Sequence, residues 1–359
     1  MKTILYTIPH LLRSGPTLVL YGLIKNLDRA RFTPVILTLA DEQTNSLKPD
    51  FEKLDIQVYC LHKRGINTFL SGAIQFRRLL TQIKPDIIHA NGFRDIVLTA
   101  LFAPKKYKKC ATVHCDWHVD YCLKYGGVTG RMSSYLQSRA LQQIHCRIAC
   151  SQMLADLLNK KYPHLNFNYV NNGVDTEKFH PVSDKMALRR QLKLPTDKEI
   201  IIWAGSFIPR KDPLTMAKAI CQIPENQYYF VFCGARGPLL EICKEMLKTR
   251  RDVLFTGYIT NIEQYYQAAD RYVSTSLSEG LPLAVLEAQF CGLKPLLSDI
   301  PQHRYIFPQE HDLFPVQRPH TLVDKILVDS KTTAISEQLN NFSAQKMSQK
   351  YQELYEKYR

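Results

Sequence analysis

Two carboxylates, eight positions apart, mark the stretch of the sequence best suited to chemistry, residues 278–299. Glu279 follows an apolar run that predicts a buried strand, and Glu287 lies among apolar residues. A carboxylate in apolar surroundings needs a charged or hydrogen-bonding partner if it is buried. Each glutamate alone could equally be a helix cap or a partner of the helix dipole. Their chemistry therefore depends on what the rest of the chain places beside them.

A short helix is predicted in this stretch. Pro282 suits its first turn, and Gly292 followed by Pro295 suits its end. Glu287 would lie about two turns beyond Glu279, so both side chains could face one crevice. Unpaired N–H groups at the helix start would favour an anion. These donors belong to Leu281, Leu283 and Ala284.

A pair of cations, Arg210 and Lys211, follows another predicted strand, which ends at Gly205. An exposed Arg-Lys pair is usually only solvated, but its position after a strand-ending glycine favours a binding role. Arginine offers bidentate contacts to oxyanions, and lysine offers a compact charge. Such cations would stabilise the negative charge that develops on a departing diphosphate.

Polar residues also follow predicted strands in the N-terminal half. Gly15 opens the first helix, His89 and Asn91 end the fourth strand, and His114 ends the fifth. Ligands of parallel α/β sheets bind at the carboxyl ends of the strands. A structural explanation stays open for each: a Gly-Pro helix start is common, Asn91 could satisfy its own turn, and a lone histidine is more often structural.

The elements that must position these residues alternate between strands and helices. This order predicts parallel sheets with helices on both faces. The expected strands lie at 3–8, 34–39, 56–61, 86–90, 110–114, 147–150, 228–234 and 253–257. Helices are expected at 69–83, 131–143, from about 214, and at 344–358.

Composition is that of an ordinary folded chain: 359 residues and 45% hydrophobic residues favour two domains with sizeable cores. No apolar run approaches the length of a spanning helix, and the first residues predict a strand rather than a signal peptide. The ten cysteines include no C-x2-C pair, which favours reduced, mostly buried thiols in a cytoplasmic protein.

Charge is uneven along the chain. Residues 1–180 hold 24 Lys and Arg against 13 Asp and Glu, whereas residues 181–359 hold 23 against 20. Segment 105–147 combines eight cations with Trp117, Tyr121, Tyr125 and Tyr135, a mixture that suits an anionic membrane surface. A solvated helix face is the alternative. A basic nucleic-acid-binding protein without catalysis would give no reason for the glutamates or the cation pair.

Taken in order, five features resemble the retaining family-4 glycosyltransferases (glycosyl transferases group 1) of the GT-B fold. They are Gly15, His114, the N-G-V-D run at 172–175, Arg210-Lys211, and the E-x7-E pair Glu279 and Glu287. The resemblance spans nearly the whole chain. It implies two doubly wound Rossmann-like domains facing across a cleft. Residues 1–172 would form the acceptor-side domain, to which helix 344–359 crosses back, and residues 173–343 the nucleotide-sugar-binding domain.

The resemblance also implies roles for individual residues. His114 and Glu279 would lie beside the donor hexose, Glu287 would bind the ribose hydroxyls, and Arg210 and Lys211 would bind the diphosphate. The remaining donor-binding positions would be Gly15, Gly205, Tyr258, Ile259, Gly280, Leu281, Leu283 and Ala284. Two departures stand out. Pro16 removes a backbone donor from the loop at Gly15, and Cys115 with Asp116 leaves the carboxylate near His114 without a fixed position.

The implied reaction is transfer of a hexose from a nucleotide sugar, a UDP-sugar rather than a GDP-sugar, to an acceptor hydroxyl with retention and without a metal or other cofactor. The acceptor expected is a lipid-linked saccharide of bacterial surface polysaccharide synthesis, such as O-antigen, capsule or exopolysaccharide. The protein is expected in the cytoplasm, at the inner face of the membrane, without nucleic acid as a partner. A nucleotide-sugar epimerase or hydrolase of the same fold remains an alternative.

Overall fold

Two compact units make up the chain: residues 1–173 with 344–359 (unit 1), and residues 174–343 (unit 2). The structure is a computed structural model and describes all residues except 44, 226, 308–311, 329–336 and 358–359. The boundaries predicted from the sequence were 172/173 and 343/344. Each unit is a parallel sheet with covering helices, which confirms the predicted pair of doubly wound α/β domains.

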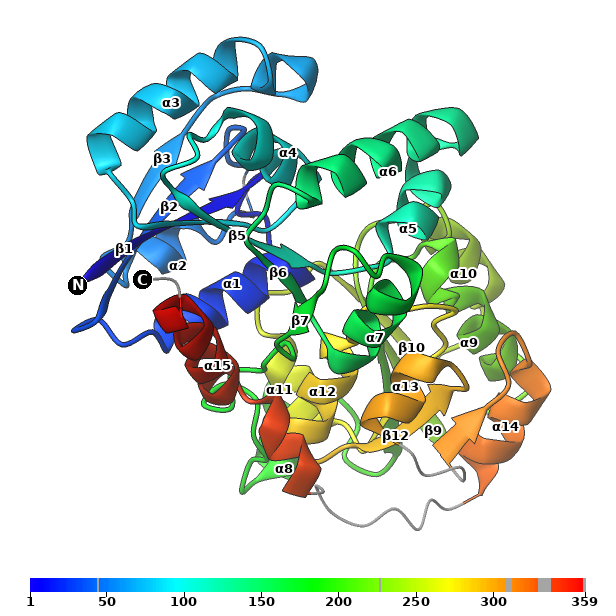
Figure 1. Cartoon of the computed structure of the whole chain (residues 1–359). Helices are drawn as coiled ribbons and strands as arrows, with labels where there is room; N and C mark the ends of the chain where they lie inside the picture. Colours follow the sequence, from blue (N-terminus) through cyan, green and yellow to red (C-terminus); the bar gives the residue numbers. More distant parts are fainter. Residues whose placement is uncertain (44, 226, 308–311, 329–336, 358–359) are drawn as a thin grey trace. The chain divides into compact units, whose positions relative to one another are not determined.

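Unit 1 contains a seven-stranded sheet in the order β3-β2-β1-β4-β5-β6-β7 (Figure 1). Strand order reverses between β1 and β4, and ligands of such sheets bind at the carboxyl ends of the strands beside this point. Its strands are β1 (Lys2–Ile8), β2 (Phe32–Thr38), β3 (Gln57–Cys60), β4 (Ile87–Ala90), β5 (Lys108–Val113), β6 (Cys146–Ala149) and β7 (Asn168–Tyr169). Its helices are α1 (Gly15–Lys25), α2 (Lys48–Glu52), η1 (Gly65–Thr68), α3 (Ser71–Ile83), α4 (Phe93–Phe102), α5 (Trp117–Tyr125), α6 (Gly127–Leu141), α7 (Gln152–Lys161) and α15 (Ala344–Lys357).

The final helix α15 completes unit 1, where it packs against α1 (Figure 1). Gly22 of α1 allows the approach, because a Cβ there would lie 3.3 Å from the Cβ of Ala344. Tyr355 of α15 shares a 2.5 Å hydrogen bond with His89 Nδ1, and His89 Nε2 lies 2.8 Å from Thr112 Oγ1. His89 is therefore fully buried within unit 1. The prediction that it faces a binding cleft is wrong, because tyrosine and threonine hydroxyls already satisfy both of its nitrogens.

Unit 2 contains a six-stranded parallel sheet in the order β10-β9-β8-β11-β12-β13, with its reversal between β8 and β11. Its strands are β8 (Glu199–Ala204), β9 (Tyr228–Cys233), β10 (Val253–Gly257), β11 (Arg271–Ser274), β12 (Lys294–Ser298) and β13 (Leu313–Phe314). Its helices are α8 (Lys185–Gln191), η2 (Pro209–Lys211), α9 (Pro213–Ile220), α10 (Leu240–Met246), α11 (Ile262–Ala268), α12 (Leu283–Phe290), α13 (Pro301–Ile306), α14 (Pro319–Leu327) and η4 (Glu337–Phe342).

Apolar runs in the sequence became central strands because helices cover both faces of each sheet. In unit 2, Ile201, Phe230 and Val273 of three neighbouring strands are completely buried in one core cluster. In unit 1, Leu5 and Ile88 belong to a second cluster under α3 and α4. None of the helices in the described parts of the chain is long and apolar enough to cross a membrane.

Some element boundaries differ from the prediction. Helix α6 begins at Gly127 rather than 131, and α3 begins at Ser71 after the short helix η1. Pro282 is the N-cap of α12 rather than a residue of its first turn. The end of α12 was predicted correctly: Gly292 follows it with φ of 83°, a left-handed conformation that glycine adopts without strain.

Candidate active site

Three side chains surround the Glu279 carboxylate in unit 2. Lys211 Nζ donates to Oε1 at 2.6 Å, and Arg210 Nη1 donates to Oε2 at 2.9 Å. Ser276 Oγ also donates to Oε1, at 2.7 Å. A carboxylate offers about four lone-pair positions, so three are occupied and one remains on Oε2. The structure thus brings the adjacent cations Arg210 and Lys211 to Glu279, which lies 69 and 68 positions away from them, along with a serine that the sequence analysis missed.

The electrostatics of this cluster leave it open to an anion. Burial opposes the charge on Glu279, but Lys211 and Arg210 outweigh it and lower the pKa of the carboxyl to about 2. Glu279 is therefore ionised, and two cations with one carboxylate leave one net positive charge. The side chain of Glu279 is only 6% exposed, whereas Arg210 is 36% and Lys211 20% exposed. The cations are more exposed than the carboxylate, so an approaching phosphate meets the cations first and a cluster of net positive charge.

Two loops are joined to hold this cluster. Thr275 Oγ1 accepts from Trp203 Nε1 at 3.1 Å and donates to the backbone oxygen of Lys211 at 2.9 Å. The backbone of Leu277 donates to the oxygen of Arg210 at 2.8 Å. The lysine side chain packs over Gly205, since a Cβ there would lie 3.7 Å from Lys211 Cδ, an ordinary contact distance. The loop after β8 and the loop after β11 therefore act as one support, at the strand-order reversal of unit 2.

Glu287 has a different environment on α12. Its carboxylate forms no hydrogen bond with any described residue, and burial raises its pKa to about 7, opposed by Lys178 and assisted by Glu263. Those two residues pair with each other at 3.0 Å. Both Glu287 and Glu279 add to the effect of burial in raising the pKa of Tyr272 well above its usual value. Both glutamates therefore lie close enough to one buried tyrosine to affect the ionisation of its hydroxyl.

The remaining predicted donor positions lie at strand ends and at the start of α12. The N–H groups of Leu281, Leu283 and Ala284 donate to no acceptor among the described residues. Tyr258 follows β10 and is 48% exposed. Ile259 and Gly280 are half-buried in the loops after β10 and β11.

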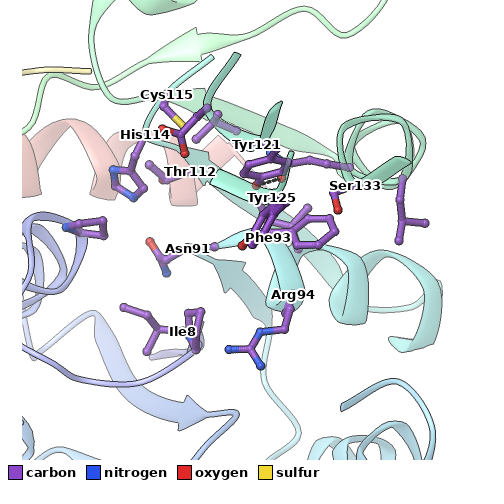
Figure 2. A pocket seen from close by; sticks show the side chains of 18 of the residues that line it. Ile8, Asn91, Phe93, Arg94, Thr112, His114, Cys115, Tyr121, Tyr125 and Ser133 are labelled. Carbon is purple, nitrogen blue, oxygen red and sulfur yellow. Dashed lines mark hydrogen bonds between the residues drawn. The ribbon is translucent and has the colours of Figure 1, made fainter. Parts of the chain in front are cut away.

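Unit 1 has its own pocket, of about 810 Å³, at the carboxyl ends of β1, β4 and β5 (Figure 2). His114 lines it, and neither ring nitrogen of this residue has a hydrogen-bond partner although both are buried. Burial lowers the pKa of the imidazole to about 4, so the ring is neutral. Asn91 also lines the pocket while its amide donates to the backbone oxygens of Thr7 and His89. Asn91 therefore satisfies its own turn, as the structural interpretation predicts, and also lies where it could contact a ligand.

Asp120 is a carboxylate that lines the pocket together with His114 and Cys115, and it acts on the Cys115 thiol, whose pKa it helps burial to raise. Asp116 instead caps α5 by accepting from the backbone of His118, and it pairs with Lys161 at 2.8 Å. Asp116, the acid considered from the sequence, is not among the residues that line the pocket, whereas Asp120, four residues later on α5, is. The sequence signal for it was an acid one helical turn after the cap.

Gly15 is the exposed first residue of α1 and is not itself among the residues that line the pocket. Its neighbours Ser14, Pro16 and Thr17 line it instead, and Ser14 Oγ lies 3.0 Å from Thr17 Oγ1. The start of α1 thus contributes to the pocket through the residues on either side of Gly15.

The fold and the two sites define the class as a GT-B glycosyltransferase, and comparison with known proteins identifies the family. Residues 13–178 match the family described as Glycosyltransferase Family 4, and residues 184–353 match Glycosyl transferases group 1. Together these matches span nearly all of the chain. The chain belongs to the family-4 glycosyltransferases, and the predicted family is confirmed.

Individual relatives are more distant. An Escherichia coli UDP-Gal:alpha-D-GlcNAc-diphosphoundecaprenol alpha-1,3-galactosyltransferase is 27% identical over 80% of this chain and 79% of its own length. The O-antigen biosynthesis glycosyltransferase WclY of Escherichia coli is 23% identical over 98% of this chain and 97% of its own length. Among solved structures, Anabaena HepE in complex with UDP and glucose has a TM-score of 0.82 at 18% identity, covering 99% of this chain and 100% of HepE.

Proposed function

We propose that the protein transfers a hexose from a nucleotide sugar to an acceptor hydroxyl with retention at the anomeric carbon and without a metal. The observation that carries this proposal is the cluster of Arg210, Lys211 and Glu279. Its cations are exposed to a ligand, retain a net positive charge, and are held rigidly by a buried carboxylate. A departing nucleoside diphosphate develops negative charge, and preorganised cations stabilise that charge most effectively.

The donor is proposed to bind across the loops of unit 2. The diphosphate would contact Arg210 and Lys211, and the free N–H groups at the start of α12 would supply further donors. Glu287 would accept the ribose hydroxyls, since its carboxylate has no other partner among the described residues. The remaining lone pair on Glu279 Oε2 would accept a hexose hydroxyl. A UDP-sugar is favoured because the galactosyltransferase relative is named for UDP-Gal and HepE is known in complex with UDP and glucose.

The proposed acceptor is a lipid-linked saccharide of bacterial surface polysaccharide synthesis, such as O-antigen, capsule or exopolysaccharide. Support comes from the names of two relatives, which include a diphosphoundecaprenol acceptor and O-antigen biosynthesis. The pocket of unit 1 would receive this acceptor, with His114 and Asp120 offering polar contacts to hydroxyls. The protein would work in the cytoplasm at the inner face of the membrane.

Replacing Lys211 with alanine tests the proposal. The charge on the leaving group would lose its nearest stabilising partner, so kcat should fall by about 10²- to 10³-fold. Steady-state release of nucleoside diphosphate from a UDP-hexose measures the effect, and Lys218→Ala on the exposed side of α9 is the matched control. Full turnover by Lys211→Ala, with the control also active, would remove the proposed role of the cluster.

Independence of metal is a separate expectation. If the two cations replace a metal ion at the diphosphate, the rate should be unchanged in excess EDTA. The same assay measures it, before and after adding Mg²⁺ or Mn²⁺. Loss of activity in EDTA that either ion restores would show that a metal shares the diphosphate with Arg210 and Lys211.

A further inference from the structure

Arg94 is the feature of the unit 1 pocket that the proposed function leaves unused. Among the described residues that line this pocket, it is the single Lys or Arg. Its guanidinium forms no hydrogen bond or ion pair with any residue in the described ranges, and its side chain is half-buried. The acid next to it in sequence, Asp95, is fully buried, accepts from the backbone of Asn91 and Gly92, and has a pKa that burial raises to about 7 although Arg94 acts to lower it. The guanidinium on the wall of the pocket can therefore still donate to an anionic ligand.

The other polar groups of the pocket do not supply this anion. His114 is neutral, and Asp120 lies within reach of the Cys115 thiol, whose pKa burial and Asp120 both raise. No ion pair joins Asp120 to Arg94 within the described chain. In Figure 2, Asn91 lies between His114 and Arg94, so the cation is at one end of the polar side of the cavity. The His114 end of the pocket suits the hydroxyl groups of a ligand, and the Arg94 end suits an anionic group.

The opposite wall of the pocket is apolar. Phe93 and Tyr121 meet at a ring distance of 5.1 Å, and Tyr121 and Tyr125 at 5.7 Å. These aromatic residues gather together in Figure 2. Met132 of α6 extends this wall and is 67% exposed, so the apolar surface continues from the cavity to the outside. A flexible hydrocarbon chain could lie along it and leave at the rim.

We propose that this pocket binds an anionic amphiphile, in which Arg94 contacts the phosphate and the α5–α6 wall contacts the hydrocarbon chain. The inference rests on the proposed function, since it describes the part of a lipid-linked acceptor that adjoins the sugar. It makes Arg94 a determinant of acceptor class: an acceptor with a phosphate beside the sugar would be preferred to a neutral glycoside with the same chain. Arginine suits this task because its planar fork forms two parallel bonds to phosphate oxygens.

Direct binding tests the inference without knowledge of the acceptor sugar. The probe is farnesyl diphosphate, titrated calorimetrically into the full chain saturated with UDP, so that the diphosphate site of unit 2 is already occupied. Arg94→Gln should weaken binding about 10- to 100-fold, the range expected for hydrogen bonds to a charged group. Arg94→Lys should retain part of the affinity. Arg78→Gln, on the exposed surface of α3, is the matched control and should bind as the wild type does.

Two further probes separate the parts of the ligand. Farnesol and inorganic pyrophosphate should each bind more weakly than farnesyl diphosphate, because each lacks one half of the proposed contacts. Met132→Glu should weaken the binding of farnesyl diphosphate but not the binding of UDP. Equal binding of farnesyl diphosphate by Arg94→Gln and wild type, or equal binding of farnesol, would overturn the inference. If the wild type binds UDP and turns over donor but does not bind farnesyl diphosphate, the inference fails and the proposed function stands.

Discussion

Glu287 is the one ionisable residue of α12, and ionising its carboxyl lowers the stability of the unliganded protein. Its folded pKa of about 7 exceeds the usual value of 4.5. The protonated form is therefore favoured on folding, and stability declines as the pH rises from about 4.5 through 7. Retaining such a residue makes physical sense if its carboxylate gains a partner when a ligand binds, as the ribose hydroxyls of the proposed donor would provide.

Glu287→Gln should consequently stabilise the protein at pH 8 and weaken its binding of nucleotide. A shift of this size corresponds to about 3 kcal/mol, so the gain in free energy of unfolding should approach that value at pH 8 and vanish near pH 4. Urea unfolding at both pH values measures the gain, and calorimetry with UDP measures affinity. If the variant is no more stable than the wild type at pH 8, the raised pKa of the half-buried Glu287 carboxyl is contradicted, whatever the affinity for UDP.

At the scale of elements, the loop after β8 that carries Arg210 and Lys211 (the cation loop) packs against the loop after β9. Gly234 makes this contact possible, because a Cβ there would lie 2.0 Å from the backbone oxygen of Gly205. Gly237 contacts the backbone of Phe207 in the same way, because a Cβ at Gly237 would lie 2.1 Å from the backbone oxygen of Phe207. The sequence analysis did not single out either glycine. Their role depends on two strands that are neighbours in space but separated by a helix in the chain.

Gly234→Ala should displace the cation loop. Backbone atoms cannot yield as a flexible side chain does, so we expect a loss of about 2 kcal/mol or more in unfolding free energy, together with weaker binding of UDP. Gly127→Ala at the start of α6 is the control, since nothing lies within 4 Å of its Cβ position. Thermal unfolding and UDP titration would measure both variants. Normal affinity and stability in Gly234→Ala would show that this contact does not position Lys211.

At the scale of the whole molecule, the basic aromatic segment 105–147 is not one surface, which corrects the sequence-based expectation. Lys109 is buried and donates to the backbone oxygen of Ala100 at 3.0 Å. Trp117 and Tyr121 are also buried, because they pack in unit 1. Exposed residues remain at opposite ends of β5. Lys105 and Lys106 lie before this strand, whereas the exposed face of α6 lies near the pocket, with Val128, Arg131, Met132, Tyr135 and Arg139.

Membrane contact is therefore expected at α6 rather than at the lysines. Arg131→Glu with Arg139→Glu should weaken binding to vesicles containing phosphatidylglycerol, by about 1 kcal/mol for each cation lost, and added salt should reduce the difference. Lys105→Glu with Lys106→Glu makes the same change in charge at the other end of β5 and is the matched comparison. Vesicle co-sedimentation measures both. Equal vesicle binding by the wild type and the α6 variant would show that the exposed face of α6 does not contact the membrane.

The sequence by itself determined the two α/β domains, since apolar runs separated by helical patterns can bury their surface only as parallel sheets with helices on both faces. It also determined which residues follow strand ends, and so predicted Arg210, Lys211, Glu279 and His114 as neighbours of a ligand. Tertiary structure alone decided the pairings. Glu279 binds the two cations, His89 is satisfied by a tyrosine from the final helix, and Arg94 faces a pocket without a partner. The physical reason is that hydrogen bonding and burial depend on side chains brought together from distant parts of the chain. The spacing of residues along one strand or helix does not predict these contacts.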